Sequence, residues 1–446
     1  MRGGASLPDF ARPAIARRRV RLPVVRAKGG DHSSIYYFLT SIFRGPSPAE
    51  YQASLDDPFY EPCDRLLLYR GRQFAAHVHI THRTMHFGPL QIPAAGLDWL
   101  ATAPQCRGRG LGTHLLEAAE REMALNGALV GWLRTSIPHF FRRTGWALCG
   151  QASFRRANAR TVLARLLDCG FVPRSRRRLH VRPWRQWEQR ALARIYRQNV
   201  QSNALPSAPY GPLERTDAYW RWLLRRKACD EVYVALEGPE LLELGEISTR
   251  IVGYAAIRGE QIVELMTAPD RPRAAAELLA RCCGDAIEHD RQCVLLHAPP
   301  SYPLFRIFDE ADGCRQPSPG ECVEVCMARL LDPLELLRRL CGEFDGRARA
   351  ARVPRPLDLG LLVEGKKYQL ELGREGVAAT SQRIGRSYLR LNVADFTRLL
   401  LGQLDWDAAM ADGRLECSTA LAREAGRALF PALPLWRPPW DDLPAP

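Results

Sequence analysis

A short glycine-rich stretch at residues 107–112 carries the most specific chemical signal in the sequence. It reads Arg-Gly-Arg-Gly-Leu-Gly, follows an apolar segment at 97–102 and precedes a helical pattern at 115–123. Glycines let the backbone approach a ligand closely, and the N–H groups at the start of a helix attract anions. The stretch therefore predicts a phosphate-binding turn between a strand and a helix. An ordinary tight turn is the alternative interpretation.

Two familiar phosphate-binding patterns do not fit this stretch. The dinucleotide fingerprint needs glycines spaced G-x-G-x-x-G and an acidic residue about 20 residues later. Here the glycines at 108, 110 and 112 are spaced G-x-G-x-G. The nucleoside-triphosphate loop needs Gly-Lys-Ser or Gly-Lys-Thr after its glycines, and neither follows here. Both of these ligand classes are thereby disfavoured.

The stretch does resemble the acyl-CoA loop of the GNAT N-acetyltransferases, R/Q-x-x-G-x-G/A, which residues 107–112 match in full. Ala103-Pro104 precedes it, as is usual in that family. A second segment at 140–146, Phe-Phe-Arg-Arg-Thr-Gly-Trp, resembles the family's F-Y-x-x-x-G-F/W and follows an expected strand at 129–133. The resemblance implies a GNAT fold and acetyl-CoA as co-substrate.

The resemblance also implies which residues bind acetyl-CoA. The backbone at Leu100, Ala101 and Thr102 is expected to meet the thioester and the pantetheine arm as an added strand would. For Arg107 and Arg109 the alternative is a solvent-exposed charge. The remaining cofactor-binding residues implied by the family pattern are Arg107, Gly108, Arg109, Gly110, Leu111, Gly112, Thr113, Ser136 and Ile137.

The elements expected around this loop recur later in the chain. The second set comprises strands at 231–236, 250–257 and 261–267, Ala268-Pro269, a helix at 273–288 and a strand at 292–298. No glycine lies between 268 and 273, and proline has no backbone N–H to offer a phosphate. The sequence therefore predicts a degenerate GNAT-like domain that does not bind CoA and forms one wall of the substrate site.

The last unit places four expected strands before its helices, which is typical of an α+β layer. Residues 391–396 and 413–416 resemble a sterol-carrier-protein-like domain. The predicted fold class is α/β and α+β, multidomain: two tandem GNAT folds, the second degenerate, and then the sterol-carrier-like domain. The predicted parts are a disordered arm at 1–19, a GNAT domain at 20–168, the degenerate copy at 169–343 and the last domain with its tail at 346–446.

This domain order resembles the enhanced-intracellular-survival (Eis) acetyltransferases. The resemblance implies N-acetylation of a primary amine by acetyl-CoA, the acceptor being aminoglycoside-like, a polyamine or a lysine side chain of a peptide. It also implies a homo-oligomer, a hexamer in that family. The alternative function is a catalytically weak protein that binds CoA or lipid.

Acetyl transfer to an amine needs a base for the attacking ammonium and an acid for the departing thiolate. The family's acid is the tyrosine of F-Y-x-x-x-G-F, but Phe141 stands at this position. That departure puts the usual mechanism in doubt, and His139 and Ser136 are the nearby candidates for replacing the acid. For the base, the Eis relatives imply the terminal carboxylate, here on Pro446. Asp98 is the second candidate, because a strand carboxylate near the thioester serves as base in other GNAT enzymes.

Composition sets broader bounds on the protein. A chain of 446 residues, 46% hydrophobic and 25% charged, is expected to hold two or three globular domains. It shows no apolar run of 18 residues and no secretory leader, so a cytoplasmic location without a membrane span is expected. The 13 cysteines include no CxxC pair, which favours reduced thiols and no metal. The net charge of +14 suits anionic CoA, and nucleic-acid binding through arginine runs such as 174–178 is the weaker alternative.

Overall fold

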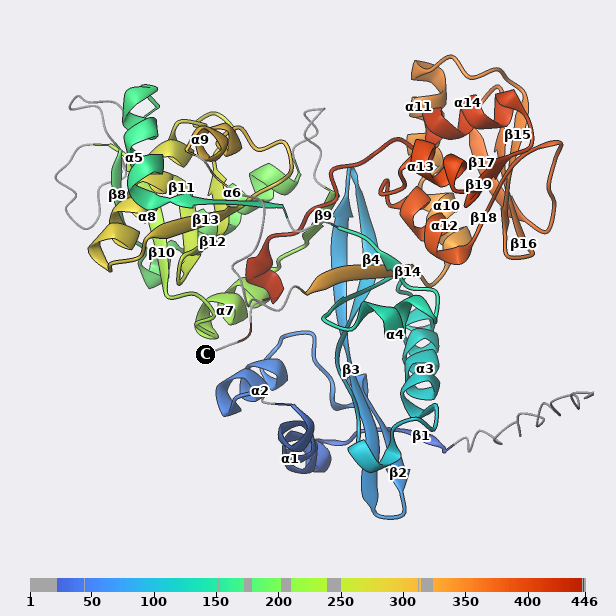
Figure 1. Ribbon diagram of the computed structural model, residues 1–446, viewed down its shortest axis with the longest axis horizontal. Helices are drawn as coiled ribbons and strands as arrows, with labels where there is room; N and C mark the ends of the chain where they lie inside the picture. The colour runs from blue at the N-terminus through green and yellow to red at the C-terminus, as the bar shows by residue number, and fades with distance from the viewer. Residues whose placement is uncertain are drawn as a thin grey trace, which may run out of the picture.

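The computed structural model describes residues 22–43, 45–150, 153–171, 179–201, 210–238, 250–311, 313, 324–442 and 444. Within these residues the strands form three sheets, each with one parallel pair among antiparallel ones. The sheets and their helices make three lobes (Figure 1). The predicted arm at 1–19 and the arginine run at 174–178 lie outside the described residues.

The first sheet has the order β1-β2-β3-β4-β5-β14-β6, and β9 pairs with β3. Its strands are β1 (Val24–Arg26), β2 (Arg65–Arg70), β3 (Gln73–Phe87), β4 (Leu90–Thr102), β5 (Val130–Thr135), β6 (Ala147–Leu148), β9 (Tyr210–Leu213) and β14 (Val325–Leu330). Its helices are α1 (His32–Ile42), α2 (Pro48–Leu55), α3 (Leu111–Leu125) and α4 (Pro138–Arg142). Helix α3 lies on one side of the long β3–β4 hairpin and α1 and α2 on the other (Figure 1).

The β3–β4 hairpin opens a gap in this sheet. Strand β4 pairs in parallel with β5 only at residues 94–96. Beyond that point β5 continues alongside β14, while β4 stays with β3 and shifts register near His79. Trp99 there has a φ of +49°, and such a bulge bends a strand and re-aims its side chains. No described strand therefore pairs with the second edge of β4 at 97–102.

The second sheet has the order β7-β13-β12-β11-β10-β8. Its strands are β7 (Phe154–Asn158), β8 (His180–Pro183), β10 (Glu231–Glu237), β11 (Arg250–Arg258), β12 (Gln261–Thr267) and β13 (Cys293–His297). Its helices are α5 (Ala159–Asp168), α6 (Gln189–Val200), α7 (Asp217–Arg225), α8 (Ala274–Glu288) and α9 (Phe305–Glu310). Helix α8 connects the parallel pair β12 and β13, as α3 connects β4 and β5 in the first sheet.

Strands are exchanged across the boundary that the sequence suggests near residue 168. Residues 154–158 lie inside the GNAT domain predicted at 20–168, but they form β7, which pairs with β13 of the second sheet. Arg155 and Ala157 are buried and their neighbours are less so, which is the two-residue period of a strand. Asn158 then caps α5 by accepting from the N–H groups of Arg160 and Thr161. In return, β14 and β9 join the first sheet although they lie later in the chain.

The third sheet has the order β17-β16-β15-β18-β19. Its strands are β15 (Leu357–Val363), β16 (Lys366–Leu372), β17 (Val377–Ser381), β18 (Ser387–Leu391) and β19 (Leu415–Cys417). Its helices are α10 (Pro333–Arg339), α11 (Cys341–Ala350), α12 (Val393–Leu400), α13 (Trp406–Ala411) and α14 (Ala420–Leu429). The strands-first order expected from the sequence is present, although α10 and α11 precede it.

Helix α11 crosses the predicted start of the last domain at residue 346. The helix buries Phe344 and Ala348, which are four residues apart, and it packs against α14 and β17. On its exposed side Arg349 pairs with Asp345 at 2.8 Å, a spacing that supports a helix. The third lobe therefore begins before residue 346.

The last described residues leave the third lobe and return to the other two. This C-terminal segment (residues 433–442) is drawn in red and crosses the centre of the molecule toward the second sheet (Figure 1). Leu435 bridges Tyr210 of β9, and the Trp436 N–H donates to the Tyr210 carbonyl at 2.8 Å. The segment ends in a short 3-10 helix, η5 (Pro439–Asp442). None of the described helices is long and apolar enough to cross a membrane.

Candidate active site

The glycine-rich loop leads into α3 with the geometry of an anion site. Gly108 and Gly110 have φ values of +72° and +79°, which glycine adopts without strain. Gly110 is the N-cap of α3 and supplies no side-chain cap, and the first turn holds no acidic residue. The first N–H groups of the helix, at Leu111, Gly112 and Thr113, are thus left for a ligand.

The surroundings of these glycines fit a phosphate-bearing ligand. No heavy atom lies within 4 Å of where a Cβ would stand at Gly108 or Gly110, so the loop is open. At Gly112, by contrast, a Cβ would lie 3.2 Å from the Thr102 hydroxyl and 3.6 Å from the Phe140 ring. The end of β4, the loop and α4 therefore meet at one place. Arg107 donates to the Thr102 carbonyl at 3.2 Å.

The other residues implied for acetyl-CoA lie on β4, on the loop and after β5. Leu100, Ala101 and Thr102 lie on the part of β4 that does not pair with β5. Arg109, Ser136 and Ile137 are exposed, and the Ile137 N–H already donates to Thr135 Oγ1 at 3.0 Å. The loop approaches the end of β4 at Gly112 and Thr102, while residues 136–137 follow β5.

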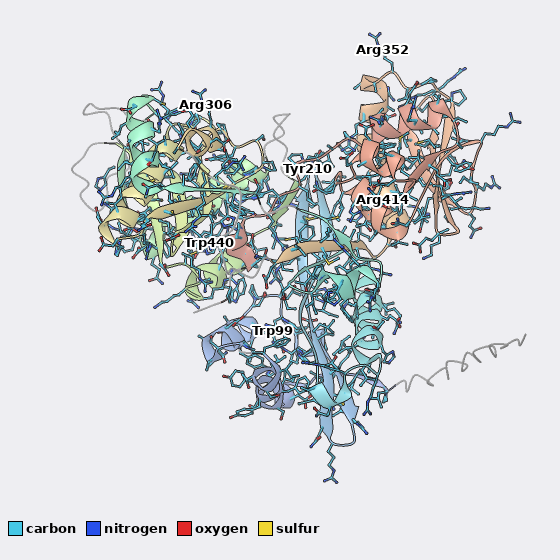
Figure 2. All side chains as sticks on the ribbon, in the orientation of Figure 1. Trp99, Tyr210, Arg306, Arg352, Arg414 and Trp440 are labelled. Carbon is cyan, nitrogen blue, oxygen red and sulfur yellow. The ribbon has the colours of Figure 1, made fainter. Side chains whose placement is uncertain are left out.

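A central cavity of about 430 Å³ lies where β4 and β5 diverge. Its walls come from the β3–β4 hairpin and β5, from α2 and the loop after it, from α7, and from the C-terminal segment. Figure 2 shows Trp99 on the first lobe and Trp440 at the facing edge of the second. Its described carboxylates outnumber its arginines: Glu50, Asp57, Asp98, Glu324, Asp441 and Asp442 against Arg83, Arg134, Arg226 and Arg437.

Asp98 is the exceptional carboxylate of this cavity. Its side chain is accessible from the cavity, and it has no hydrogen-bond or ion-pair partner among the described residues. Its pKa is raised to about 6, first because the surrounding protein removes bulk water and next because Asp442 has the same charge. Three arginines act in the opposite direction, Arg83, Arg437 and Arg65. A carboxylate with such a pKa can accept a proton near neutral pH.

The remaining cavity carboxylates are engaged. Asp57 pairs with Arg83, whose guanidinium lies over the rings of Tyr219 at 5.2 Å and Trp222 at 5.9 Å. Asp442 pairs with Arg437 at 2.9 Å. Glu50 accepts a hydrogen bond from the Ser47 N–H, Glu324 pairs with Arg134, and Asp441 pairs with Arg215. Asp56, expected from the sequence to share an acidic mouth, is exposed and not part of the lining.

A buried layer under Asp98 fixes its strand. The His77 ring bonds the Trp99 carbonyl through Nδ1 at 3.1 Å, and His79 stacks on the Trp99 ring with centroids 5.8 Å apart. Arg65 is fully buried and lies over the Trp99 ring at 5.2 Å. Burial, with the Arg65 charge next, lowers the pKa of His77 to about 3 and that of His79 well below its usual value. Both histidines are therefore neutral near pH 7.

Two of the other catalytic candidates lie away from the cavity, and the third is not among the described residues. Phe141 lies in the core of the first lobe, 6% exposed, and touches the rings of Phe140 and Trp146 rather than the cavity. His139 is exposed on α4 and does not line the cavity. Pro446 lies outside the described residues, although Pro444 lines the cavity. Asp98 is thus the candidate that the structure brings into the cavity.

Restoring a tyrosine at position 141 is expected to cost stability rather than to raise activity. Phe141→Tyr places a hydroxyl in an apolar core, and an unpaired buried polar group costs about 1–3 kcal/mol. Denaturant unfolding followed by tryptophan fluorescence measures this loss. A variant with unchanged stability and a higher acetylation rate would instead place residue 141 at the thioester.

Sequence reasoning missed several residues around Asp98. Arg65 packs on Trp99, the neighbour of Asp98 in β4, and Tyr219 and Trp222 line the cavity. All three occur in ordinary amphipathic stretches, and no local pattern distinguishes them from core or surface positions. Their positions follow only from the tertiary packing. Among the described residues, no three or more His, Cys, Asp or Glu side chains are placed to hold a metal ion.

Comparison with known families agrees with this geometry. Residues 24–149 match the family described as acetyltransferase (GNAT) domain. These residues hold the glycine loop, α3 and Asp98, and the family implies an acyl-CoA co-substrate. A search of curated protein sequences finds no match.

Solved structures match nearly the whole chain. A GCN5-related N-acetyltransferase from Anabaena variabilis is 16% identical over 94% of this chain and 99% of its own, with a TM-score of 0.69. A probable N-acyltransferase from Enterococcus faecalis is 14% identical over 93% and 98%, also with a TM-score of 0.69. Eis1 from Mycobacterium abscessus is 15% identical over 92% and 98%, with a TM-score of 0.61. Residues 24–149 are therefore a GNAT acetyltransferase domain, and the chain as a whole has the fold of the multidomain structures that include Eis1.

Proposed function

We propose that this protein transfers an acetyl group from acetyl-CoA to a primary amine that enters the central cavity. The observation that carries this proposal is the placement of Asp98. It is the cavity carboxylate without a described partner, and it lies within the part of β4, residues 97–102, whose second edge pairs with no described strand. We place the thioester along that edge, with its carbonyl carbon beside Asp98.

Each atom of the transfer has a place in this arrangement. The amine nitrogen attacks the thioester carbonyl carbon, the carbon–sulfur bond breaks, and CoA leaves as a thiolate. The bound ammonium first gives one proton to Asp98, acting as general base, and the neutral amine then attacks. The second proton leaves the nitrogen as the carbon–nitrogen bond forms, and we assign its transfer to the thiolate to water, because Phe141 has no hydroxyl and is buried away from the cavity.

The charges of the residues that line the cavity support a cationic acceptor. The excess of carboxylates over arginines in the lining attracts a positive charge. The side chains of Tyr219, Trp222 and Trp99 also line the cavity and offer apolar surface to the body that carries the ammonium. An aminoglycoside-like compound, a polyamine and a lysine side chain all meet these requirements, and a panel containing all three classes distinguishes them.

The other two lobes have supporting roles in this proposal. The second sheet repeats the strand, helix and parallel-strand order of the first, and no glycine stands before α8, which supports a GNAT-like scaffold without a CoA site. The third lobe, for which we propose a sterol-carrier-like fold, supplies the C-terminal segment to the cavity.

The direct test is an acetylation assay with the full chain. Purified protein is mixed with acetyl-CoA and each amine of the panel, free thiol release is followed, and the acetylated amine is identified by mass. We expect thiol release that depends on the amine. Acetyl-CoA binding measured by calorimetry without turnover of any amine would support a CoA-binding protein instead.

A further inference from the structure

The C-terminal segment is held by a fully buried ion cluster in the second lobe. The Arg215 cluster comprises Arg215, Glu264 and Asp441, and all three side chains are 0% exposed. One edge of the Arg215 guanidinium donates to both Glu264 oxygens at 2.9 and 2.6 Å. The Asp441 oxygens accept from Nε and Nη2 of Arg215 at 3.0 and 2.9 Å. Such bidentate pairs are the strong and geometrically specific ones.

Aromatic rings enclose this cluster. Arg215 lies 4.0 Å from the ring centre of Tyr196 and 5.6 Å from that of Trp440, and Tyr219 donates its hydroxyl to Asp441 at 3.1 Å. Trp440 is itself 1% exposed in the core of the second lobe. If the segment left this place, Asp441 would lose two charge-assisted hydrogen bonds from Arg215 and one from Tyr219, so the cluster retains the segment.

Strand β9 offers a second fixed contact. Gly211 has a φ of +114°, and a Cβ there would lie 2.5 Å from the Trp436 carbonyl oxygen. The Trp436 backbone carbon and nitrogen lie 3.0 and 3.2 Å from the same position and leave no room for a side chain. Tyr210 and Trp440, labelled in Figure 2, lie along the path that the segment follows between the lobes.

Asp442, the residue after the cluster, belongs to the central cavity. It pairs with Arg437 at 2.9 Å, lies 3.9 Å from Arg134, and acts electrostatically on Asp98. Two carboxylates that repel each other are both stabilised by a cation that approaches them. Asp98 and Asp442 both line the cavity, and they therefore make a place for the ammonium of the acceptor.

We propose that the Arg215 cluster is a latch that positions the C-terminal segment, so that Asp442 faces Asp98 and the two bind the acceptor's ammonium. Arg215 and Asp441 are then positioning residues, and Asp442 is a binding residue. This inference rests on the proposed amine acetylation. The second lobe has no glycine loop of its own. It completes the acceptor site of the first lobe by anchoring the C-terminal segment, which comes from the third lobe.

The test replaces Asp441 by asparagine, which keeps its shape and removes its charge. Since breaking a buried charge pair is strongly destabilising for the contact, we expect the KM for the amine to rise at least about tenfold. The Kd for acetyl-CoA is expected to stay unchanged. Hydrogen–deuterium exchange of peptides covering 435–442 is expected to accelerate. The matched control is Asp285→Asn, which changes a buried carboxylate that accepts from Tyr233 on the far side of the second lobe.

A pH profile separates positioning from general damage. The charged groups facing Asp98 are Asp442 and Arg437 from the segment, Arg83 from β3 and Arg65 from β2. Release of the segment admits water and removes Asp442, and both changes lower the pKa of Asp98. It also removes Arg437, a loss that raises the pKa, but Arg437 acts on Asp98 less strongly than Asp442 does, so the net shift is downward. The acid limb of kcat/KM is therefore expected to move to lower pH in Asp441→Asn and to stay in place in Asp285→Asn.

A second variant covers the case in which Asp441→Asn fails to fold. Gly211→Ala pushes against the Trp436 carbonyl without touching any charge, and Gly259→Ala is its control, at positive φ with nothing within 4 Å. Faster exchange at 435–442 and a higher amine KM in Gly211→Ala alone support the latch. Unchanged exchange and KM in both test variants would overturn it. Lack of acetylation by the unmodified protein overturns the proposed function instead, and the exchange experiment still reports on the segment.

Discussion

Asp98→Asn is expected to lower kcat/KM for amine acetylation by about 10²- to 10⁴-fold, the usual contribution of a positioned general base. Asparagine has the shape of aspartate but accepts no proton at neutral pH. The substitution leaves the cavity lining in place, and Asp98 has no described ion pair whose loss would disturb the fold. Steady-state thiol release at saturating acetyl-CoA measures the effect.

The pH dependence of the acetylation rate gives a second test of Asp98 as the base. Asp98 must be ionised to accept a proton, and its pKa is raised to about 6. Activity of the unmodified protein is therefore expected to fall as pH drops through about 6, losing roughly tenfold per unit below it. In Asp98→Asn this acid limb is expected to disappear, because the group that titrates has been removed.

Asp56→Asn is the matched control, since Asp56 is a nearby acid that is exposed and outside the cavity lining. Both variants are expected to bind acetyl-CoA as the unmodified protein does. Retention of full activity by Asp98→Asn would exclude Asp98 as base and would direct attention to the residues after Pro444.

The loop and its strand and helix were open to prediction because their signal is local. Gly108 and Gly110 need positive φ, and the helix after them shows its buried face in the spacing of Leu111, Leu115 and Ala119. Hydrophobic period and glycine position are properties of neighbouring residues, so the sequence displays them directly. Most strands and helices of the three sheets were expected for the same reason.

The cavity could not be predicted in this way. Its walls join β4 of the first lobe, α7 of the second and residue 442 after the third, and no sequence period links positions so far apart. Phe141 illustrates the difficulty, because its motif position suggests the cleft whereas its ring packs with Phe140 and Trp146 in the core. Strand β7 pairs with β13 in the second sheet, and β14 pairs with β5 in the first. No local sequence signal predicts these pairings, because the partners lie far apart in the chain.

Gly110→Asp is expected to weaken acetyl-CoA binding by about 100-fold or more. The new carboxylate stands at the positive end of α3, where it accepts from the free N–H groups and replaces attraction of a phosphate by repulsion. Aspartate is a favourable N-cap and is among the residues that tolerate left-handed backbone, and no atom lies within 4 Å of the new Cβ. The helix should therefore persist while the site is lost. Isothermal titration with acetyl-CoA measures the change in Kd.

Gly127→Asp is a close control for this prediction, because it introduces the same side chain at the other end of the same helix. Gly127 has a φ of +82° and, like Gly110, nothing within 4 Å of a Cβ, so the backbone strain and the steric change are matched. The charge, however, lies about 20 Å from the loop, at a rise of 1.5 Å per helical residue, and no phosphate is expected there. Equal weakening by both variants would mean that the loss comes from strain or net charge. Weakening by Gly110→Asp alone assigns the phosphates to the start of α3, since only there does the carboxylate compete for the same N–H groups.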